Sequence, residues 1–398
     1  MKKLMILGAS VLQLPAIKQA KEMGLDVIAV DMDPNAIGFS ESEVKKEVIS
    51  TIDIPEVVKA AKKHNVDGVI TVASDMPMRS VAAVAKELNL IGITAETAIK
   101  ATNKFVMRQA FKEHNVACPE FYKVSTKTEF LAAMSNFSKP FIVKPADNSG
   151  SRGVFLVKDL NDTDKALEAY EYSAKYSRNG DVMVEEYMVG PEVSVELFSI
   201  NGVCTVLQVT DKLTTGAPHF VEIGHSQPSS LPADALQKIR NLAINASLAV
   251  GIQDGPAHAE IILTEDGPKM VEIGARMGGG CITTHLVPFS TGINMTKATI
   301  ENALGLSPDI TPSITKGSAI RFIIPTPGIV SSIDIEDALK VDGVKEIVVQ
   351  CKVGQIIGAL ENGSSRIGYV ITQADTVSNA IKICELALSK IKISVLQD

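Results

Sequence analysis

The residues best suited to chemistry are two glutamates and an arginine in the middle of the 398-residue chain, Glu260, Glu272 and Arg276. Carboxylates that face each other across paired strands lie about 4.5–5.5 Å apart at Cβ and repel. A divalent cation removes that repulsion, and carboxylate oxygens completed by phosphate and water are typical ligands of Mg²⁺. The Arg276 guanidinium adds a planar positive group suited to a phosphoryl group or an acyl phosphate. Taken alone, these residues also suit the exposed face of an ordinary hairpin.

The hairpin that must carry these groups is predicted from the residues around them. Two strands are expected, at about 257–263 and 269–273. A two-residue Asp-Gly turn would need an N–H that Pro268 lacks, so we expect a five-residue loop that pairs Leu263 with Lys269. This register sets Glu260 directly opposite Glu272. The other face is then filled by apolar side chains, those of Ile261, Leu263, Val271 and Ile273.

A second candidate site lies earlier, where a predicted strand ends in Lys144 and a glycine- and serine-rich loop, 147–153, follows. Glycine and serine permit unusual φ angles and let backbone N–H groups approach phosphate oxygens, and Arg152 adds charge. The loop is not a Walker A sequence, because the GK[ST] ending is absent. A phosphate cradle and a flexible hairpin tip both remain open for it.

Residues 182–198 predict a strand, a short connector and an alternating strand. Such a connector offers a backbone N–H and C=O edge to an adenine, and an acidic residue such as Glu192 to ribose hydroxyls. Two strands of an antiparallel sheet with polar faces would give the same pattern.

Several other side chains have two interpretations. His219 and His225 lie in a stretch, 218–225, that is too polar for a core strand, and no third soft ligand stands at a spacing suited to a metal. They are expected to line a polar cleft or to face water. Arg321 is a lone charge in an apolar strand, so an exposed arginine and a substrate contact both fit. Cys281 has no evident base, which disfavours a catalytic nucleophile.

The first hundred or so residues must form a scaffold for these groups. Apolar runs alternate with helical patterns, which predicts a parallel α/β unit that resembles half of a Rossmann fold. Only Gly8 of the G-x-G-x-x-G fingerprint is present, so dinucleotide binding is not supported and a scaffold on the substrate side is the better interpretation. The predicted strands are 4–7, 26–31, 47–49 and 68–72, and the predicted helices are 55–64 and 76–88.

Composition limits the class of protein. The length favours two to three domains, and 45% hydrophobic residues are ample for buried cores. A net charge of −7 argues against nucleic acid or an anionic membrane as the main partner. Five scattered cysteines without a C-x-x-C pair are typical of a reducing compartment. With neither a signal peptide nor an uninterrupted apolar span, the sequence indicates a soluble cytoplasmic protein.

The order of these features resembles the ATP-grasp superfamily: a lysine, a glycine-rich loop, a Glu-Glu-Tyr-Met connector, then paired acids and Arg276. The resemblance covers essentially the whole chain. It implies an α/β and α+β multidomain protein with an ATP-grasp fold, an N-terminal Rossmann-like domain and a small, β-rich C-terminal cap. The implied domains are 1–102, 103–304 with a lid at about 119–188, and 305–398.

The resemblance also implies roles for the matching residues. Contacts to the nucleotide phosphates or adenine N7 would come from Lys104 and Lys144. The loop closing over the phosphates would be Ser149, Gly150, Ser151, Arg152 and Gly153. The adenine and ribose would meet Glu185, Glu186, Tyr187, Met188 and Glu192. Mg²⁺, or Mn²⁺ in its place, would be held by Glu260 and Glu272, and the catalytic candidates are Lys144, Glu272 and Arg276.

The sequence departs from the superfamily at one position. The usual continuation is E-x-N-x-R, and Gly274 stands where the asparagine ligand would be. Glycine has no side-chain oxygen, so a second metal would rely on Glu272, phosphates and water. The resemblance therefore implies one Mg²⁺ and leaves the second open.

Within the superfamily, the chain is most similar to the dipeptide-forming L-amino acid ligases, through residues 210–228 and 272–280. This likeness implies that a carboxylate attacks ATP to give an acyl phosphate, which an amine then attacks, with water excluded by the lid. Glu222 would pair with the ammonium of the N-terminal amino acid. The implied substrate-binding residues are His219, Glu222, His225, Arg276, Gly279 and Arg321.

Two alternatives remain beside a ligase that joins two amino acids. A purine-biosynthesis enzyme like glycinamide ribonucleotide synthetase, or one like carbamoyl-phosphate synthetase, would need extra cations for a substrate phosphate, and residues 208–232 offer only Lys212. A catalytically silent nucleotide-binding regulator is disfavoured by the retained Lys144, Glu260, Glu272 and Arg276. The resemblance implies a homodimer, and the side chains of the two substrates stay open.

Overall fold

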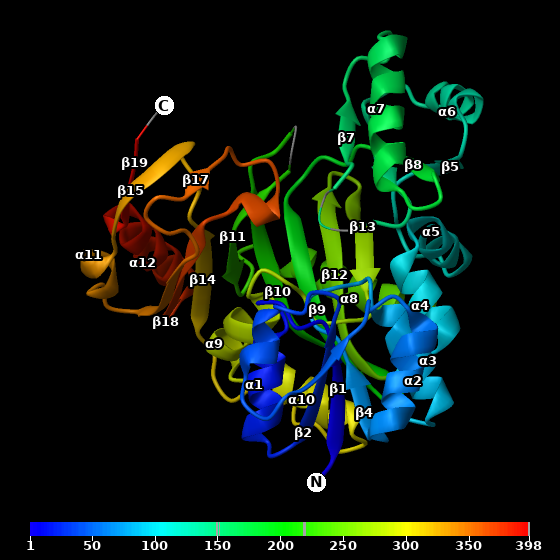
Figure 1. Ribbon diagram of the computed structural model, residues 1–398. Helices are drawn as coiled ribbons and strands as arrows, with labels where there is room; N and C mark the ends of the chain where they lie inside the picture. Colours follow the sequence, from blue (N-terminus) through cyan, green and yellow to red (C-terminus); the bar gives the residue numbers. More distant parts are fainter. Residues whose placement is uncertain (149, 151, 218–219, 397–398) are drawn as a thin grey trace.

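The computed structural model describes residues 1–148, 150, 152–217 and 220–396. Within these residues, four β-sheets organise the chain. A parallel sheet lies at the N-terminal end, a large antiparallel sheet forms the middle, and two smaller sheets flank it (Figure 1). The described part of the chain contains no helix long and apolar enough to cross a membrane.

The N-terminal sheet is four-stranded and parallel, in the order β3-β2-β1-β4, which confirms the predicted α/β unit. Residues 4–7 of β1 are fully buried, as expected for a parallel strand covered on both faces. Helices α1 and α10 (Met295–Ala303) lie on one side and α2 and α3 on the other (Figure 1). The elements are β1 (Lys3–Leu7), α1 (Leu14–Glu22), β2 (Asp26–Asp31), η1 (Ile37–Ser40), β3 (Lys45–Val48), α2 (Ile54–His64), β4 (Gly68–Ile70), α3 (Met78–Glu87) and α4 (Ala95–Thr102).

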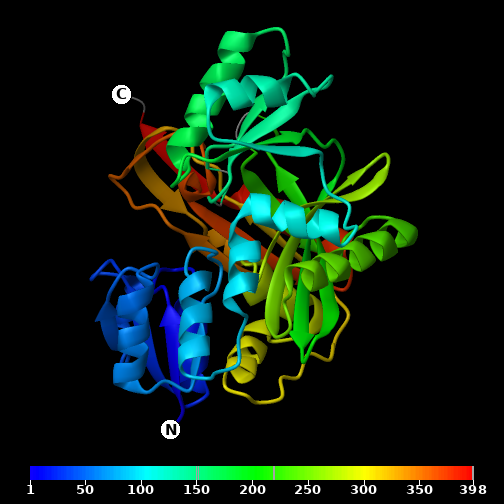
Figure 2. The ribbon, with the colours of Figure 1, turned by 90° about the vertical axis from the view of Figure 1, so that its right-hand side faces the viewer.

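A small antiparallel sheet, β5-β8-β6-β7, carries two helices on its outer face and covers the large sheet from above (Figure 2). Its own apolar core includes Phe130, Phe141 and Tyr170. Its elements, with the helix that leads into it, are α5 (Lys104–Glu113), β5 (Phe121–Val124), α6 (Lys127–Met134), β6 (Phe141–Pro145), β7 (Phe155–Val157), α7 (Thr163–Tyr176) and β8 (Val182–Glu186).

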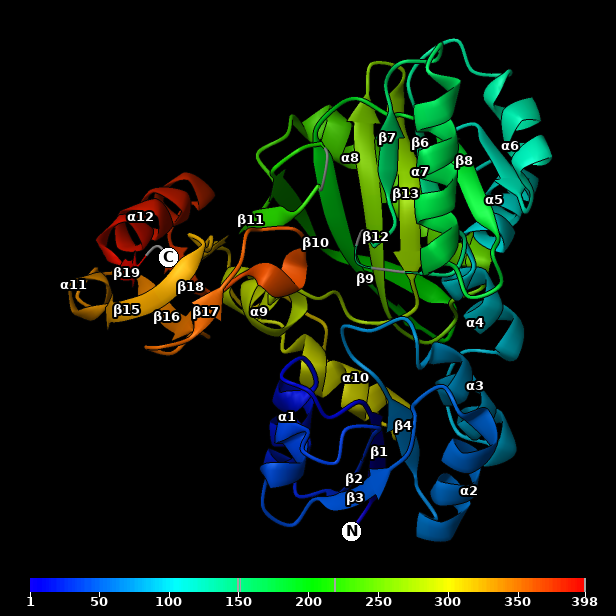
Figure 3. The same ribbon diagram turned by 45° about the horizontal axis from the view of Figure 1, so that its top comes forward.

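The large sheet has eight antiparallel strands in the order β13-β12-β9-β10-β11-β14-β18-β16. Helix α8 packs across one face of this sheet, against β13, β12, β9 and β10, and the N-terminal unit lies below the sheet (Figure 3). The elements that precede residue 304 are β9 (Glu192–Ile200), β10 (Val203–Thr214), β11 (Glu222–Gln227), α8 (Ala233–Val250), β12 (Gly255–Thr264), β13 (Gly267–Gly274), η2 (Ile282–Leu286), α9 (Val287–Thr291) and α10 (Met295–Ala303).

The C-terminal residues extend the large sheet and add a small one, β17-β15-β19. Helix α12 packs on β14 and β18. Since β14, β18 and β16 continue the large sheet, the division proposed at residue 304 separates two parts of one sheet. The elements are β14 (Gly317–Phe322), β15 (Gly328–Asp334), α11 (Glu336–Leu339), β16 (Val344–Val349), β17 (Ile356–Ile357), η3 (Gly363–Ser365), β18 (Gly368–Ala374), α12 (Val377–Lys390) and β19 (Lys392–Leu396).

The β12–β13 hairpin confirms the pairing of Glu260 with Glu272, but the predicted five-residue loop is wrong. The ladder continues to Thr264 and Gly267, and Leu263 lies opposite Pro268. Gly267 has a φ of 117°, so glycine rather than proline takes the strained position of the turn.

A β-bulge restores the glutamate pair. The register shifts between Glu260 and Ile261, which leaves Val271 as the extra residue on β13. Met270, fully buried, therefore takes the core position that was predicted for Val271. Val271 instead lines a cavity, and its carbonyl oxygen accepts a hydrogen bond from Arg108 Nη2 at 2.7 Å.

Strand β11 corrects a second prediction. The stretch 218–225 was considered too polar for a core strand, yet its residues 222–225 belong to β11, which pairs with β10 and β14 inside the large sheet. Gln227 of β11 finds partners there: it is fully buried, donates to Thr210 at 2.8 Å and accepts from Ser290 at 2.9 Å. A buried strand tolerates a polar residue that is hydrogen-bonded in this way. The buried His225 differs, because neither of its ring nitrogens has a hydrogen-bond partner among the described residues.

Candidate active site

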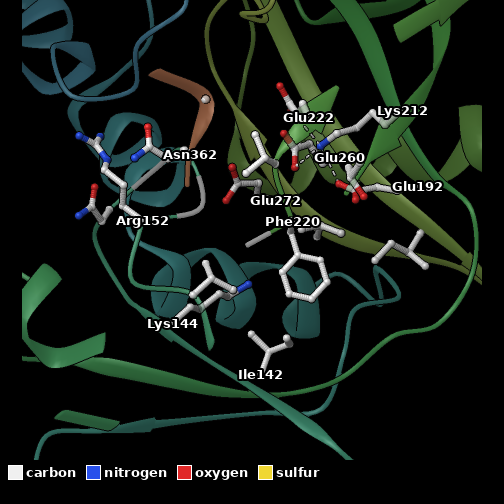
Figure 4. A pocket seen from close by; sticks show the side chains of 18 of the residues that line it. Ile142, Lys144, Arg152, Glu192, Lys212, Phe220, Glu222, Glu260, Glu272 and Asn362 are labelled. Atoms are coloured by element: carbon white, nitrogen blue, oxygen red, sulfur yellow. Dashed lines mark hydrogen bonds and ion pairs between the residues drawn. The ribbon is translucent and has the colours of Figure 1, made fainter. Parts of the chain in front are cut away.

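A cavity of about 310 Å³ lies between the small sheet and the large sheet. Ile142 and Lys144 stand on the small-sheet side, while Glu192, Lys212, Glu222 and Glu260 gather on the large sheet (Figure 4). Three parts of the chain that are far apart in sequence therefore line one space: the small sheet, the large sheet and the loop 361–366.

Lys144 belongs to a buried ion network on the small-sheet side. Its Nζ lies 2.6 Å from Glu185, which also accepts two hydrogen bonds from Arg108, at 3.0 and 3.1 Å. Burial opposes ionisation of Glu185, but the positive charges of Arg108 and Lys144 outweigh it and lower its pKa to about 2. Burial lowers the pKa of Lys144, against the opposing effect of Glu185. Glu185 thus fixes the lysine at the cavity wall.

Lys104 is presented by the first turn of α5. Asn103 caps this helix by accepting a hydrogen bond from the Val106 N–H at 3.1 Å. Lys104 Nζ donates to the Asn148 carbonyl at 2.7 Å and lies 2.9 Å from Glu272. Burial opposes its charge, but Glu272 outweighs burial and raises the pKa of Lys104.

Lys212 connects three carboxylates on the large sheet. Its Nζ lies 2.7 Å from Glu192, 3.1 Å from Glu260 and 3.4 Å from Glu222 (Figure 4). Burial opposes the charge on Lys212, but the three carboxylates raise its pKa well above the ordinary value. Lys212 was considered in the sequence only as a phosphate contact. Its neighbours on β9, β11 and β12 become visible only once the strands are in register.

Glu260 also has a partner beneath it. His258 Nδ1 lies 2.6 Å from the fully buried Glu196, and His258 Nε2 lies 3.4 Å from Glu260. Burial disfavours an imidazolium, but Glu196 outweighs it and raises the pKa of His258 to about 9. A Cβ on Gly278 would lie 2.5 Å from His258 Nδ1, so glycine makes room for this pair. Neither Glu196 nor His258 was singled out from the sequence.

Glu260 and Glu272 form the candidate metal site. Both line the cavity, and their hard oxygens suit Mg²⁺. Among the described residues, no group of three or more His, Cys, Asp or Glu side chains could hold a metal ion. The two glutamates therefore fit a metal that takes its remaining ligands from phosphate and water.

Arg276 is held by the N-terminal unit. It donates to Asp75 through Nε at 2.8 Å and Nη2 at 2.9 Å, and Asp75 raises its pKa against the effect of burial. A Cβ on Gly274 would lie 2.6 Å from Asp75 Oδ1, so a side chain at residue 274 would collide with this ion pair. Asp75, Gly274 and Glu272 line a neighbouring cavity of about 230 Å³.

The residues predicted at the adenine and ribose lie together at the cavity. Glu185, Glu186, Tyr187, Met188 and Glu192 all line it. The Glu186 carboxylate is paired with Lys269, at 2.8 and 3.0 Å.

The glycine-rich loop is only partly described. Gly150 and Arg152 line the cavity, while Ser149 and Ser151 lie outside the described residues. The Gly153 carbonyl accepts a hydrogen bond from Ser173 at 2.6 Å, which ties the loop to α7.

The predicted substrate residues are only partly brought together. Glu222 lines the cavity, and His225 Nε2 lies 3.5 Å behind it. His219 lies outside the described residues. A Cβ atom added to Gly279 would lie 3.8 Å from the Cβ of Ala73. Gly279 does not line the described cavity.

Arg321 is placed differently from both expectations. Its side chain is only 10% exposed, and it donates to the backbone carbonyls of Ile320 and His225 at 3.0 and 3.4 Å. Arg321 therefore neither faces solvent nor lines the cavity in the described part of the chain. Arg366, which does line it, was missed. The signal was available, because 362–366 combines glycine, serine and arginine, as the loop 147–153 does.

His285 lies four residues after Cys281, and its Nε2 lies 3.2 Å from Glu346. Burial disfavours the charged imidazole, but Cys281 and Glu346 raise the pKa of His285 to about 9. This group lies outside the residues that line the cavity.

Comparison with known protein families identifies two regions. The ATP-grasp domain family matches residues 137–285, and the L-amino acid ligase C-terminal domain 2 family matches residues 321–396. An L-arginine-specific L-amino acid ligase of Bacillus subtilis is 24% identical over 72% of this chain and 71% of its own length.

Two solved structures match nearly the whole fold. The L-amino acid ligase from Bacillus licheniformis is 24% identical with a TM-score of 0.85, covering 100% of this chain and 99% of that one. Phosphoribosylglycinamide synthetase from Anaerococcus prevotii is 26% identical with a TM-score of 0.81, covering 99% and 100%.

The fold, the cavity and the domain match define the class: this chain is an ATP-grasp ligase that forms a carbon–nitrogen bond and releases ADP. Its ATP-grasp domain is followed by an L-amino acid ligase C-terminal domain, and its relatives include L-amino acid ligases. The predicted fold class and the resemblance to this group are thereby confirmed.

Proposed function

We propose that this ligase joins two L-amino acids into a dipeptide, with ADP and phosphate as the other products. One observation carries the proposal: Glu222 lines the same cavity as Lys104, Lys144 and the Glu260–Glu272 pair. An ammonium-binding carboxylate thus lies within one space with the groups suited to ATP. The L-amino acid ligase domain over residues 321–396 supports the same substrate class.

The nucleotide would lie along the small-sheet wall. Lys104, Lys144 and Arg152 would bind its phosphates as charge-assisted hydrogen-bond donors. The backbone from Glu185 to Met188 would face the adenine, and Glu192 the ribose. Because Lys144 is held 2.6 Å from Glu185, its ammonium is oriented before the nucleotide arrives.

Glu260 and Glu272 would hold Mg²⁺, or Mn²⁺ in its place. The ion, when bound, supplies positive charge that offsets the charge on a transferring phosphoryl group. His258 and Glu196 keep the Glu260 carboxylate oriented from below. Lys104 and Lys212 neutralise the two carboxylates when no ion is present.

The amino-acid side of the reaction would use Glu222 and Arg276. Glu222 would pair with the ammonium of the amino acid whose carboxylate is phosphorylated. Arg276 would exchange Asp75 for the acyl phosphate and then for the tetrahedral intermediate, since its planar fork suits both. The small sheet above the cavity would exclude water, which would otherwise hydrolyse the acyl phosphate.

A matrix assay tests the proposal. Purified protein with Mg²⁺-ATP is incubated with every pair of the standard L-amino acids, phosphate release is measured, and products are identified by mass. The proposal requires release that depends on particular pairs and a product equal in mass to the pair minus water. Release with a single amino acid, without a dipeptide, would instead mean that the amine partner is of another class.

A second candidate is a ligase that joins glycine to phosphoribosylamine. The observation in its favour is the pair Arg79 and Arg178, which line the neighbouring cavity beside Glu272 and offer cations for a substrate phosphate. Glycine with enzymatically generated phosphoribosylamine belongs in the same assay, and phosphate release with that mixture alone would favour this candidate.

The proposal includes a homodimer in the cytoplasm. Light scattering coupled to gel filtration measures the mass in solution, and a mass near 42.4 kDa would contradict the dimer. Cell fractionation with an antibody tests the location.

A further inference from the structure

We propose that Arg366 binds a carboxylate of the amino acid whose ammonium faces Glu222. The inference rests on the proposed function and extends it, because it names a group of the C-terminal region that selects the substrate. Arg366 lies at the end of the loop 361–366, four of whose residues line the cavity: Glu361, Asn362, Gly363 and Arg366.

The Arg366 guanidinium is fixed on one side and open on the other. Its Nε donates to the Gly363 carbonyl at 2.7 Å, its Nη1 donates to the Glu222 carbonyl at 3.3 Å, and its Cζ lies 3.8 Å from the centre of the Phe322 ring. A guanidinium has five N–H groups. Three of them therefore find no hydrogen-bond acceptor in the described part of the chain.

The burial of Arg366 is incompletely compensated. Its side chain is 19% exposed, and its nearest carboxylate oxygen, on Glu222, is 3.8 Å away, beyond hydrogen-bond distance. Burial lowers the pKa of Arg366, which means that the protein alone does not fully replace the water it has lost. A rigid, partly desolvated guanidinium with free N–H groups at a cavity wall is arranged to receive an anion.

The charge beside Arg366 indicates which anion. Glu222 has 34% of its side chain exposed and lies next to the guanidinium. A phosphate bound by Arg366 would be repelled by Glu222, whereas an amino acid can place its ammonium on Glu222 and its carboxylate on Arg366. Adjacent groups of opposite charge are thus complementary to a zwitterion.

The two halves of this subsite come from different regions of the chain. Glu222 lies within the ATP-grasp match, 137–285, while Arg366 and Phe322 lie within the C-terminal match, 321–396. Phe322 is on β14, which pairs directly with β11 that carries Glu222. The shared sheet therefore sets the distance between the ammonium-binding and the carboxylate-binding group.

Binding without turnover tests the inference. The protein is saturated with Mg²⁺ and a non-hydrolysable ATP analogue, and each standard L-amino acid is titrated by calorimetry. The tightest-binding amino acid is then compared with its α-carboxamide, which keeps the ammonium but has lost the negative charge. The variants are Arg366→Gln and Arg366→Lys. The control is Arg240→Gln, because Arg240 is a half-buried arginine on α8 that lines neither of the two cavities described above.

We expect Arg366→Gln to weaken amino-acid binding about ten- to hundredfold, because a charge-assisted hydrogen bond is lost. Affinity for the ATP analogue and binding by Arg240→Gln should change less than about twofold. Arg366→Lys should recover only part of the loss. If the α-carboxylate is the anion, all amino acids weaken alike and the carboxamide binds poorly even to wild type. If it is a side-chain carboxylate, only aspartate and glutamate weaken.

Three results would overturn the inference. They are equal amino-acid affinity of wild type and Arg366→Gln, a loss confined to the nucleotide, and no amino-acid binding to wild type. The first two leave the proposed dipeptide ligase standing if the matrix assay yields dipeptides. Conversely, Arg366-dependent amino-acid binding without dipeptide formation would support this subsite and contradict the proposed reaction.

Discussion

Replacing Glu185 by glutamine should be among the most destabilising single changes at the cavity. Glu185 is 3% exposed and is the shared carboxylate partner of two buried cations, Arg108 and Lys144. Glutamine keeps the shape of the side chain but leaves both cations without a counter-charge. Uncompensated buried charge of this kind costs about 3–5 kcal/mol.

The pKa of Glu185 gives a second route to the same magnitude. Its pKa is lowered from 4.5 to about 2 on folding, and one pKa unit corresponds to about 1.4 kcal/mol, so the ionised carboxylate contributes about 3 kcal/mol of stability. Because the folded pKa is lowered, this contribution is present above pH 4.5. It is lost as the pH falls from there towards 2.

The assay is thermal unfolding at neutral pH, with Glu186→Gln as the matched control. Glu186 is the next residue along the chain, is 35% exposed and pairs with Lys269, so its removal should cost at most about 1 kcal/mol. At about 2–4 °C per kcal/mol, a loss of about 3 kcal/mol should make Glu185→Gln melt roughly 6–12 °C below wild type. Lys144→Met, which leaves the neutral pair of Arg108 and Glu185, should retain its melting temperature but lose ATP affinity.

Two results would refute this reasoning. If Glu185→Gln and Glu186→Gln melted within about 2 °C of each other, the buried network would not hold the stability assigned to it. If the gap between wild type and Glu185→Gln did not narrow between pH 5 and pH 3, the lowered pKa of Glu185 would be wrong.

Three further changes test the metal site and its surroundings. Glu272→Gln should reduce Mg²⁺-dependent phosphate release about a hundredfold or more, and near-normal turnover would rule out Glu272 as a ligand. Gly274→Asn should not create a better metal site, because its Cβ would lie 2.6 Å from Asp75 Oδ1. We expect the free energy of unfolding to fall by about 1–3 kcal/mol and the activity to be lower. Higher activity at low Mg²⁺ would contradict this. His258→Gln should leave Glu196 buried without a cation, which should cost about 3–5 kcal/mol of stability. It should also raise the Mg²⁺ concentration needed for half-maximal rate, since His258 contacts Glu260. An unchanged Mg²⁺ dependence would mean that His258 does not position Glu260.

The hairpin illustrates how far local sequence rules reach. The pairing of Glu260 with Glu272 was predicted correctly, although the turn and the register beside it were not. The alternation of residues along a strand predicts which side chains share a face. The bulge at Val271 adds one residue to β13, so the side chains on one side of it point to the opposite face from the one predicted. The bulge presents the Val271 carbonyl to Arg108, a long-range contact that no local pattern contains.

Charged and polar residues were harder to place, because their partners lie on other strands. Lys212, on β10, meets glutamates from β9, β11 and β12, and only the strand order of the sheet brings them together. Arg321 illustrates the converse, since a lone charge in an apolar strand finds its partners in backbone carbonyls of its own sheet and in Glu385 on α12. Residue type indicates that a charge needs a partner, but not which one.

The lysines beside the candidate metal ligands also bear on the order of binding. Glu272 is neutralised by Lys104 and Glu260 by Lys212, so a free Mg²⁺ ion would have to compete with two ion pairs. ATP phosphates offer Lys104 an alternative partner at the moment when Glu272 is needed by the ion. Lys104 would then exchange the Glu272 carboxylate for a phosphate, and Glu272 would exchange the lysine for the metal ion. No charge would be left unpaired. The arrangement therefore favours entry of nucleotide and metal together over entry of the metal alone.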